Sequence, residues 1–416
     1  MLIVLLSWPS CCKKNNFSMS LIRKLLQLAL RILLFPASLI LFLLKRWLVV
    51  ELVLPNVTLF GHLALEPEKI LSKINSERSQ DRSKPKRILI WSFDKPRLQA
   101  NKTLVKIWRR ELLVLPSAVV DALHRSSKWI PNFEINILQF DKLHENDHVL
   151  DSCSSHLKFS KAQEDMGQRY LRRVGVMPGM PYVCLIVREA AWAPPTTGPS
   201  SSGTLRSRSF EDFVLAAEAL IKLGVAVIKL GAPGTFKTSG TQIIDYANSG
   251  DKSEFLDVYL PAHATAAVST MSGPDAVALA SRVPVLYIDI AQYSLCFAGT
   301  ELVTWVPALL HSQKLGRVMS LGEVFEFGAG RFLGATPFDE AKISVIKSSP
   351  EKICEHVVSF YTNLSDRAPD KTSVLQANYQ KKFHTLLSQN SVAPLGQFKS
   401  KLSEVFIADY GDVFLA

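Results

Sequence analysis

A strand–turn–helix–strand pattern between residues 257 and 289 constrains the fold of this chain most strongly. Residues 265–268 are short, apolar and partly β-branched, as buried strands are. Residues 276–281 are small and favour a helix, and residues 283–288 form a second apolar run. This is the unit from which parallel α/β sheets are built, so we expect an α/β protein.

The turn in this unit is rich in small polar residues. Such a turn lies at the carboxyl end of a strand, where open α/β sheets bind ligands. Backbone N–H groups at the start of a helix bind phosphate well, so we predict that the turn binds a phosphate or diphosphate. The alternative is an ordinary helix cap, which any α/β protein requires. The predicted ligand-binding residues of the turn are Thr270, Ser272 and Gly273.

Length and composition predict a folded protein with more than one domain. A chain of 416 residues exceeds one small core. Its 48% hydrophobic and 20% charged residues exclude an intrinsically disordered chain. The six cysteines form no Cys-x-x-Cys pair, which argues against zinc knuckles and dithiol redox sites and favours a reducing compartment.

Positive charge is concentrated near the N-terminus. Residues 1–110 carry 20 Lys and Arg against 6 Asp and Glu, whereas the whole chain has a net charge of +11. This asymmetry predicts an anionic neighbour. We expect membrane phospholipid because apolar sequence accompanies the charge. Nucleic acid is not expected, since the chain has no recognition motif for it.

The segment 1–54 is predicted to be a membrane-associated helical segment. Residues 21–54 are strongly apolar and fit a helix, and Lys45, Arg46 and Trp47 follow its charge-free part as an interfacial boundary would. That charge-free part, residues 32–44, is shorter than the roughly 20 residues needed to span a bilayer. We therefore expect a surface anchor. A tilted single span and a buried core helix are the alternatives.

A histidine follows the predicted first strand of the next domain, residues 57–60. His62 in this position can reach an active site and act as a general base, because imidazole titrates near neutral pH. The alternative is a turn histidine with a satisfied hydrogen bond. In that case Glu66 or Glu68 becomes the next candidate.

A turn-rich linker after residue 177 marks the predicted domain boundary. A buried strand, residues 182–187, comes next and is followed at once by Arg188. An arginine directly after a parallel strand points to the same carboxyl edge as the turn described above. It can bind a diphosphate bidentately, or alternatively form a salt bridge with Glu189.

Several motifs are absent from the sequence. There is no Walker A, no Gly-x-Ser-x-Gly and no Gly-x-Gly-x-x-Gly, which argues against P-loop nucleotidases, α/β-hydrolases and dinucleotide enzymes. There is also no Asp-x-Asp triplet to hold a divalent metal on a sugar nucleotide.

The order and spacing of eight segments resemble a family of bacterial glycosyltransferases of the GT-B-like type. The resemblance spans residues 57–363 and implies an α/β fold with two Rossmann-like domains that face a cleft. With it, four parts are expected: the helical segment 1–54, an acceptor-side domain 55–177, a nucleotide-sugar domain 178–363 and a helical tail 364–416. The segments are 61–64, 101–104, 159–167, 183–188, 224–231, 244–247, 254–260 and 269–273.

The resemblance implies transfer of a sugar from a nucleotide-sugar donor to a glycan or lipid-linked acceptor. The implied setting is surface polysaccharide or lipopolysaccharide synthesis, at the cytoplasmic side of the inner membrane, with the chain peripheral or singly anchored. No metal or other cofactor is expected.

Particular residues match positions of this family. Arg188, Thr270, Ser272 and Gly273 match donor-diphosphate positions, and His62 matches a base. Asp245 and Tyr246 match a family motif that we assign to donor binding. Two other functions stay open: a GT-B-like sugar-nucleotide epimerase, and a non-catalytic membrane-associated partner in polysaccharide assembly.

Overall fold

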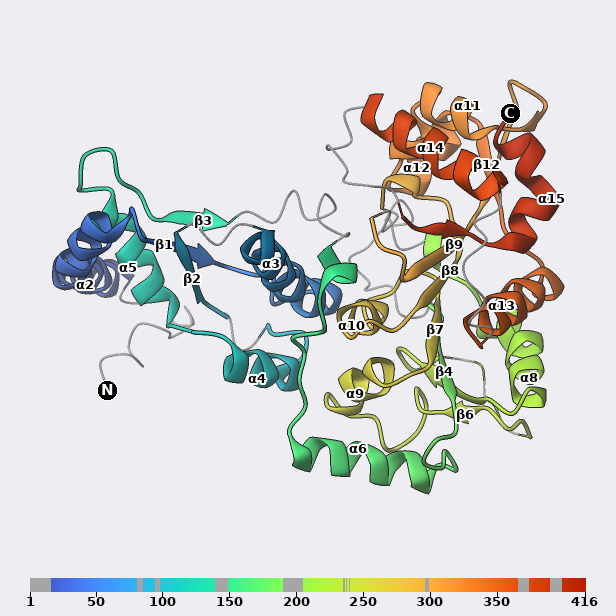
Figure 1. Cartoon of the computed structure of the whole chain (residues 1–416), viewed down its shortest axis with the longest axis horizontal. Helices are drawn as coiled ribbons and strands as arrows, with labels where there is room; N and C mark the ends of the chain where they lie inside the picture. Colours follow the sequence, from blue (N-terminus) through green and yellow to red (C-terminus); the bar gives the residue numbers. More distant parts are fainter. Residues whose placement is uncertain are drawn as a thin grey trace. The chain divides into compact units, whose positions relative to one another are not determined.

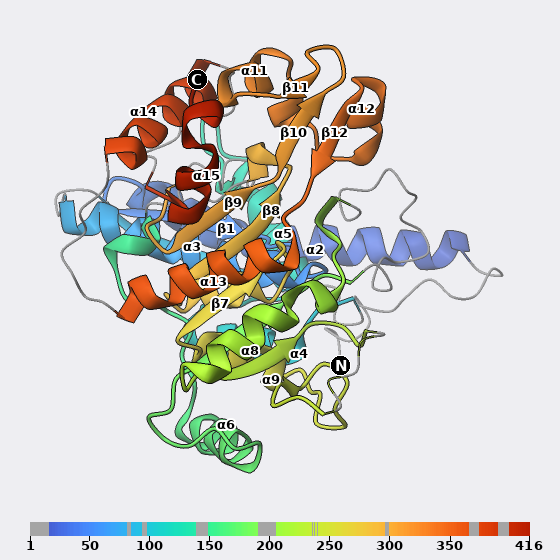
Figure 2. The ribbon, with the colours of Figure 1, turned by 90° about the vertical axis from the view of Figure 1, so that its right-hand side faces the viewer.

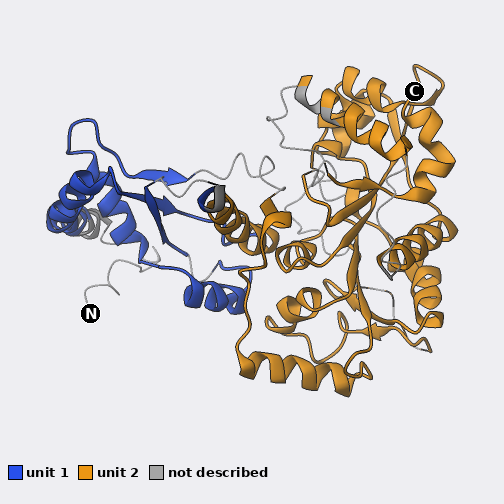
Figure 3. Cartoon of the chain, viewed as in Figure 1, with its two compact units in different colours: residues 1–59, 77–140 blue, residues 60–76, 141–416 orange. Residues whose placement is uncertain are grey.

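The chain forms two compact units (Figure 3). Unit 1 comprises residues 1–59 and 77–140, and unit 2 comprises residues 60–76 and 141–416. The computed structural model describes residues 16–80, 85–93, 98–138, 149–189, 205–234, 236, 238, 240–295, 299–365, 374–389 and 399–416.

Unit 1 is a small parallel sheet covered by helices. Its strands β1 (Leu48–Val53), β2 (Lys86–Trp91) and β3 (Asn136–Leu138) lie in the order β2-β1-β3. Leu52 of β1 and Leu123 belong to its buried core, against which Leu34 and Leu41 pack. The helices of this unit are α2 (Asn16–Leu44), α4 (Lys102–Glu111) and α5 (Ser117–Ser127).

Two sequence predictions in this region were wrong. Residues 48–53 form β1 and do not continue the helix, which ends at Leu44. The predicted strand 57–60 is a turn, and the helix α3 (Phe60–Gln80) begins at Phe60. Residues 21–54 are apolar almost throughout, so periodicity could not separate helix from strand, although the β-branched residues 49, 50 and 53 favour a strand.

Unit 2 contains a seven-stranded parallel sheet in the order β13-β9-β8-β7-β4-β5-β6. If the six strands β4 to β9 are numbered 1 to 6 along the chain, their order across the sheet, read from β6 to β9, is 3-2-1-4-5-6. This is the Rossmann order. The chain reverses its direction of winding between β4 and β7, and β13 extends the sheet beside β9. The strands are β4 (Tyr182–Ile186), β5 (Ala226–Leu230), β6 (Ile244–Asp245), β7 (Ala266–Ser269), β8 (Val285–Ile290), β9 (Val303–Pro307) and β13 (Lys401–Leu402).

Helices cover both faces of this sheet, as Figure 1 shows with the sheet nearly edge-on. Helices α9 (Leu256–Ala262) and α10 (Asp275–Ala280) lie on one face. Helices α8 (Val214–Lys222) and α13 (Pro350–Ser365) lie on the other, and Figure 2 looks onto that side. Between these two helix layers, every residue of β4, β5, β7 and β8 is buried, as an interior parallel sheet requires.

The remaining elements complete unit 2 around the sheet. A second, antiparallel sheet has the order β11-β10-β12. The tail that was predicted to be helical also contains β13. The elements are α6 (Lys161–Arg173), η3 (Phe210–Phe213), η4 (Tyr293–Leu295), β10 (Leu309–Ser312), β11 (Arg317–Val318), α11 (Leu321–Glu326), η5 (Ala329–Arg331), α12 (Ala335–Glu340), β12 (Ile343–Ile346), α14 (Val374–Gln389) and α15 (Glu404–Phe414).

The predicted α/β class with parallel sheets and an N-terminal apolar helix is confirmed. The compact units divide the chain after residues 59, 76 and 140, and the expected domain boundaries at residues 54, 177 and 363 stay predictions. Helix α6 belongs with unit 2 because it packs on α9. The Tyr259 hydroxyl of α9 donates to Glu164 at 3.0 Å, and Gly167 leaves room for the Tyr259 ring.

This packing makes a prediction about Gly167. A Cβ at this position would lie 2.0 Å from the Tyr259 ring. We expect Gly167→Ala to lower the free energy of unfolding by about 1–3 kcal/mol in urea denaturation, since overpacking outweighs the better helix propensity of alanine. Gly250→Ala is the control, because a Cβ there would have no atom within 4 Å. A more stable Gly167→Ala protein would contradict the packing described.

Candidate functional site

The switch between β4 and β7 brings Arg188 to the polar turn, as the sequence predicted. β4 pairs with β7 from Val183 to Ile186, so the two strands end side by side. The Arg188 backbone N–H, directly after β4, donates to Thr270 Oγ1 at 3.0 Å, and Thr270 N–H donates to the Ile186 carbonyl at 3.3 Å. Ligands bind at such a point in open α/β sheets because the loops on either side diverge.

A third segment, the strap formed by residues 205–209, closes over the same edge. The Arg208 N–H donates to the Arg188 carbonyl at 2.9 Å. The Arg206 guanidinium donates through Nη1 to the Met271 carbonyl at 2.9 Å. Met271 has a φ of 63°, which is uncommon for a residue with a side chain, so this bond holds the turn in a strained conformation.

Arg208 anchors the strap to the sheet. Its guanidinium forms an ion pair with Asp289 of β8 and donates to the Ser348 carbonyl at 2.9 Å. Asp289 also accepts from the Ser348 N–H at 2.9 Å. Arg208 is therefore a structural residue, and Arg206 two positions earlier stands beside the turn.

Arg188 and Arg206 form a cationic pair at the switch point. Burial, and then the positive charge of Arg206, lower the pKa of the Arg188 guanidinium. Burial also lowers the pKa of Arg206, whereas the Asp275 carboxylate opposes that change. An anion bound at this edge would stabilise both partly desolvated guanidinium groups, and their planar forks fit phosphate oxygens bidentately.

The backbone amides of residues 270–272 donate to groups inside the protein, contrary to the prediction that they face an anion. Met271 N–H donates to Ser269 Oγ at 3.1 Å, and Ser272 N–H donates to Asp275 Oδ2 at 2.6 Å. Ser269 Oγ donates to the same carboxylate at 2.6 Å. Burial raises the pKa of Asp275 to about 6, and these hydrogen bonds counteract the rise. The guanidinium groups, not the turn amides, are thus suited to bind a phosphate.

Gly273 allows close packing between the turn and the start of α3, whereas its predicted contact with a ligand stays a prediction. A Cβ at Gly273 would lie 3.3 Å from Phe60 Cβ and 3.4 Å from the Gly61 nitrogen. The first turn of α3 occupies the space beside this glycine. A valine at position 273 should therefore disturb the packing of α3 on the turn.

The same packing brings His62 to the site. A Cβ at Gly61 would lie 3.5 Å from the Gly273 Cα, so the start of α3 rests against the turn. His62 is half exposed in the first turn of α3, and its Nδ1 lies 2.6 Å from Oε1 of the buried Glu66. A carboxylate that accepts from Nδ1–H leaves Nε2 with the lone pair, the arrangement of a base with its orienting group.

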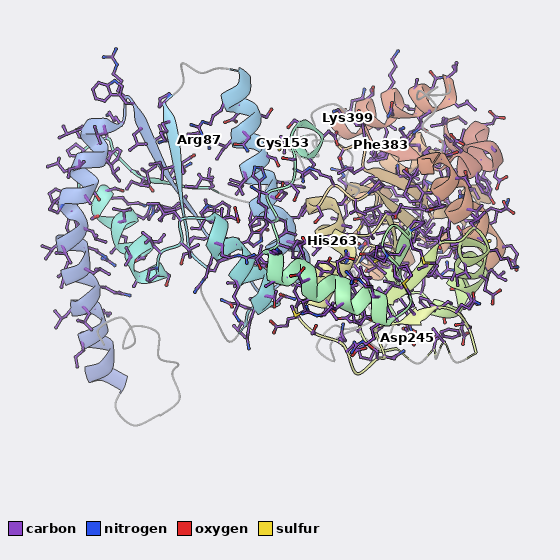
Figure 4. The ribbon with its side chains drawn as sticks, turned by 60° about the horizontal axis from the view of Figure 1, so that its bottom comes forward. Arg87, Cys153, Asp245, His263, Phe383 and Lys399 are labelled. Atoms are coloured by element: carbon purple, nitrogen blue, oxygen red, sulfur yellow. The ribbon has the colours of Figure 1, made fainter. Side chains whose placement is uncertain are left out.

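A buried ion pair fixes this part of α3 to the rest of unit 2. Arg282 Nη2 donates to Glu68 Oε1 at 2.7 Å and to Ser72 Oγ at 3.1 Å. Its Nε donates to the Cys153 carbonyl at 3.0 Å, and Figure 4 marks Cys153. Glu68 is fully buried and also accepts from the His156 N–H. Glu68 is therefore a structural residue and not the alternative base.

Asp245 and Tyr246 lie at the end of β6 (Ile244–Asp245) and at the start of the loop that follows it. Asp245 ends β6, two strands from β4, and accepts from the Asn248 N–H at 3.1 Å (Figure 4). Its Oδ1 is 4.0 Å from Nζ of the buried Lys229. Tyr246 is fully buried, and its hydroxyl donates at 3.0 Å to Asp257. Both residues organise the loop after β6. Lys229 also lies 3.6 Å from Oε2 of Glu189, so it links Asp245 to the residue that follows Arg188.

Two further observations concern ligands and missed residues. Within the described ranges of the chain, no group of three or more His, Cys, Asp or Glu side chains could hold a metal ion. Sequence reasoning missed Arg206, because it follows a low-complexity stretch and no local pattern distinguishes it from Arg208.

Comparisons with known proteins give only distant similarities. No protein-family model and no curated protein matches the sequence. A family 9 glycosyl transferase from Veillonella parvula has a TM-score of 0.44 at 9% identity, covering 77% of this chain and 98% of that one. The E. coli ADP-heptose lps heptosyltransferase II has a TM-score of 0.36 at 13% identity, covering 62% and 90%.

A third solved structure is the dodecameric heptosyltransferase TibC, described as iron-containing and in complex with ADP-D-beta-D-heptose. Its TM-score is 0.29 at 14% identity, covering 59% of each chain. All three TM-scores lie below 0.5, so we derive the function from the residues of the site.

The buried ion pair beneath α3 makes a stability prediction. Arg282→Met should lower the free energy of unfolding by about 3–5 kcal/mol, because it leaves the Glu68 charge buried without its cation. Glu68→Gln combined with Arg282→Met should be less destabilised than Arg282→Met alone. The control is Arg317→Met, which breaks an exposed pair with Glu323 and should cost no more than about 1 kcal/mol. Equal losses for Arg282→Met and Arg317→Met in urea denaturation would contradict this role.

Proposed function

We propose that this protein is a glycosyltransferase that binds a nucleotide-sugar donor at the switch between β4 and β7. The sugar passes to a glycan or lipid-linked acceptor in surface polysaccharide or lipopolysaccharide synthesis. The observation that carries the proposal is that Arg188 and Arg206 both contact the turn after β7, at the carboxyl edge of a sheet with Rossmann strand order.

The pair suits a diphosphate leaving group. When the bond between sugar and phosphate breaks, negative charge accumulates on the departing diphosphate. Guanidinium groups already in place stabilise that charge without reorganisation, and this electrostatic contribution is usually a large one. The Arg206 contact to Met271 and the Arg188 contact to Thr270 hold both segments before the donor arrives. We propose that the two arginines supply this stabilisation and that no metal is required.

His62 is the proposed general base. With Glu66 accepting from Nδ1–H, Nε2 can take the proton of an acceptor hydroxyl as that oxygen attacks the sugar carbon. Glu66 positions the ring and stabilises the imidazolium that forms. An epimerase would need a second carboxylate for proton transfer, but Glu68 is bound by Arg282 and His156, so we favour transfer.

The proposal predicts how nucleoside diphosphates bind. Arg188→Ala should weaken binding of the preferred member of ADP, UDP and GDP by roughly 1.5–3 kcal/mol, the scale of a charge-assisted hydrogen bond. Arg206→Lys keeps the charge but removes the planar fork, so it should also weaken binding. The two losses should not add, since both groups act on one diphosphate. Calorimetric titration of the folded variants measures these effects.

The control for this titration is Arg317→Ala, an arginine of the same unit whose side chain is exposed and paired with Glu323. Its affinity should equal that of the unmodified protein. If Arg188→Ala and Arg206→Lys also bind normally, the donor lies elsewhere.

Turnover tests the role of His62. His62→Ala should lower kcat by at least about a hundredfold, the usual scale for loss of a general base, while calorimetry shows donor binding unchanged. His311→Ala, in β10, is the matched control and should retain full activity. The assay measures acceptor-dependent release of nucleoside diphosphate in the presence of EDTA, where activity should persist.

Three results would contradict this account. Near-normal kcat in His62→Ala would remove the base. Activity lost in EDTA and restored by Mn²⁺ or Mg²⁺ would exclude the metal-free reaction. Conversion of the donor to a free epimer without acceptor would identify an epimerase.

A further inference from the structure

Helix α2 exposes an apolar face that a soluble helix would not carry. By length and composition, residues Lys24–Leu44 could cross a membrane. An 18-residue window of this segment has a mean hydropathy of 2.1, yet only 6% of that window is buried in the protein. This excludes the buried core helix that the sequence left open. The exposed apolar residues recur at helical spacing and so form one stripe, which we call the α2 stripe: Ile22, Leu25, Leu28, Ile32, Leu33, Leu39, Ile40, Leu43 and Leu44.

The opposite face of α2 packs lengthwise along unit 1. Ser38, which is fully buried, has its Oγ 2.8 Å from Ser126 Oγ of α5. The rings of Phe35 and Phe42 contact Trp129 and Phe133, with centroids 5.8 and 5.4 Å apart. Figure 1 shows α2 beside α5. The helix is therefore part of the folded unit from residue 31 to residue 42 and does not project from it.

This packing argues against a span across the bilayer. Asp121 of α5 lies 3.7 Å from Arg31 in the middle of α2 and 2.7 Å from Arg125. A helix that crossed the membrane would carry these charges, and the polar backbone ends of α5, into the hydrocarbon layer. Charged groups there are costly, and irregular backbone is not tolerated against lipid. A helix with one face on protein and one apolar face outward instead suits the plane of the interface.

The charges around the α2 stripe identify the surface that covers it. Lys24 stands near one end, and the exposed Lys45 and Arg46 stand at the other. Trp47, 65% exposed, follows them, and tryptophan favours the interface between lipid and water. Residues 16–44 contain no Asp or Glu. A second copy of the same basic face would be repelled, whereas anionic headgroups would be attracted.

We propose that α2 is a monotopic anchor that lies in the plane of an anionic bilayer. The α2 stripe enters the acyl boundary, Lys24, Lys45 and Arg46 contact headgroups, and the face bearing Ser38 stays on α5. This inference does not depend on the proposed catalytic activity, because it uses residues of unit 1 alone.

The test is flotation of the full-length protein with lipid vesicles. We expect binding to vesicles that contain phosphatidylglycerol, weaker binding to pure phosphatidylcholine, and release by alkaline carbonate. Leu33→Glu combined with Ile40→Glu, at side chains 73% and 56% exposed, should lower partitioning at least about tenfold. The matched control is Leu215→Glu with Val413→Glu, which adds the same charge at exposed apolar positions of unit 2 and should bind as the unmodified protein does.

Four outcomes would overturn the proposal. In the first, the unmodified protein does not bind anionic vesicles. In the second, both double variants lose vesicle binding equally, and in the third the bound protein resists carbonate extraction. In the fourth, the protein forms a concentration-dependent dimer that Leu33→Glu with Ile40→Glu abolishes. The last result would assign the face to a second copy. Thermal unfolding followed by circular dichroism checks that each variant is folded. If the first variant is not, Lys45→Glu with Arg46→Glu replaces it and should reduce binding to anionic vesicles specifically.

Discussion

The parallel pairing of β4 with β7 is the constraint on which the candidate site depends. It ends two strands side by side at the point where the sheet changes its direction of winding. Arg188 then contacts Thr270, and the strap bearing Arg206 contacts both segments. Residues more than 80 positions apart are thereby held together before any ligand binds. Such preorganisation makes two neighbouring guanidinium groups tolerable in the free protein and useful once a diphosphate arrives.

The position of His62 depends on a second constraint, the buried charge of Glu68. A carboxylate without exposure is stable only when its hydrogen bonds and its cation are in place. Arg282, Ser72 and His156 supply them and fix α3 at Glu68, six residues after His62. Gly61 and Gly273 then allow the start of α3 to rest on the turn. Glu66 and Glu68, two residues apart, have separate roles: one orients the histidine and the other holds the helix.

Much of the fold could be predicted from local sequence, and less of the site. The strands β4, β7 and β8 are buried on both faces and are mostly apolar, so their composition identifies them. Arg188 was predicted at the site because it directly follows such a strand. Arg206 could not be, since a contact to Met271 across 65 residues leaves no local pattern. The turn amides were assigned to a ligand because sequence does not reveal that Ser269 and Asp275 already accept from them. Strand β1 was not predicted, because it closely follows the apolar helix α2 and is itself apolar.

The central claim is that the diphosphate binds between Arg188 and Arg206. The most direct test is a crystal structure of the full chain with a nucleoside diphosphate that carries sulfur on its terminal phosphate, located by the anomalous signal of that sulfur. The account predicts phosphate oxygens within hydrogen-bonding distance of both guanidinium groups, beside Thr270 and the strap. A ligand bound at Lys229 of β5 and Asp245 of β6, or at any other place in the chain, would contradict it.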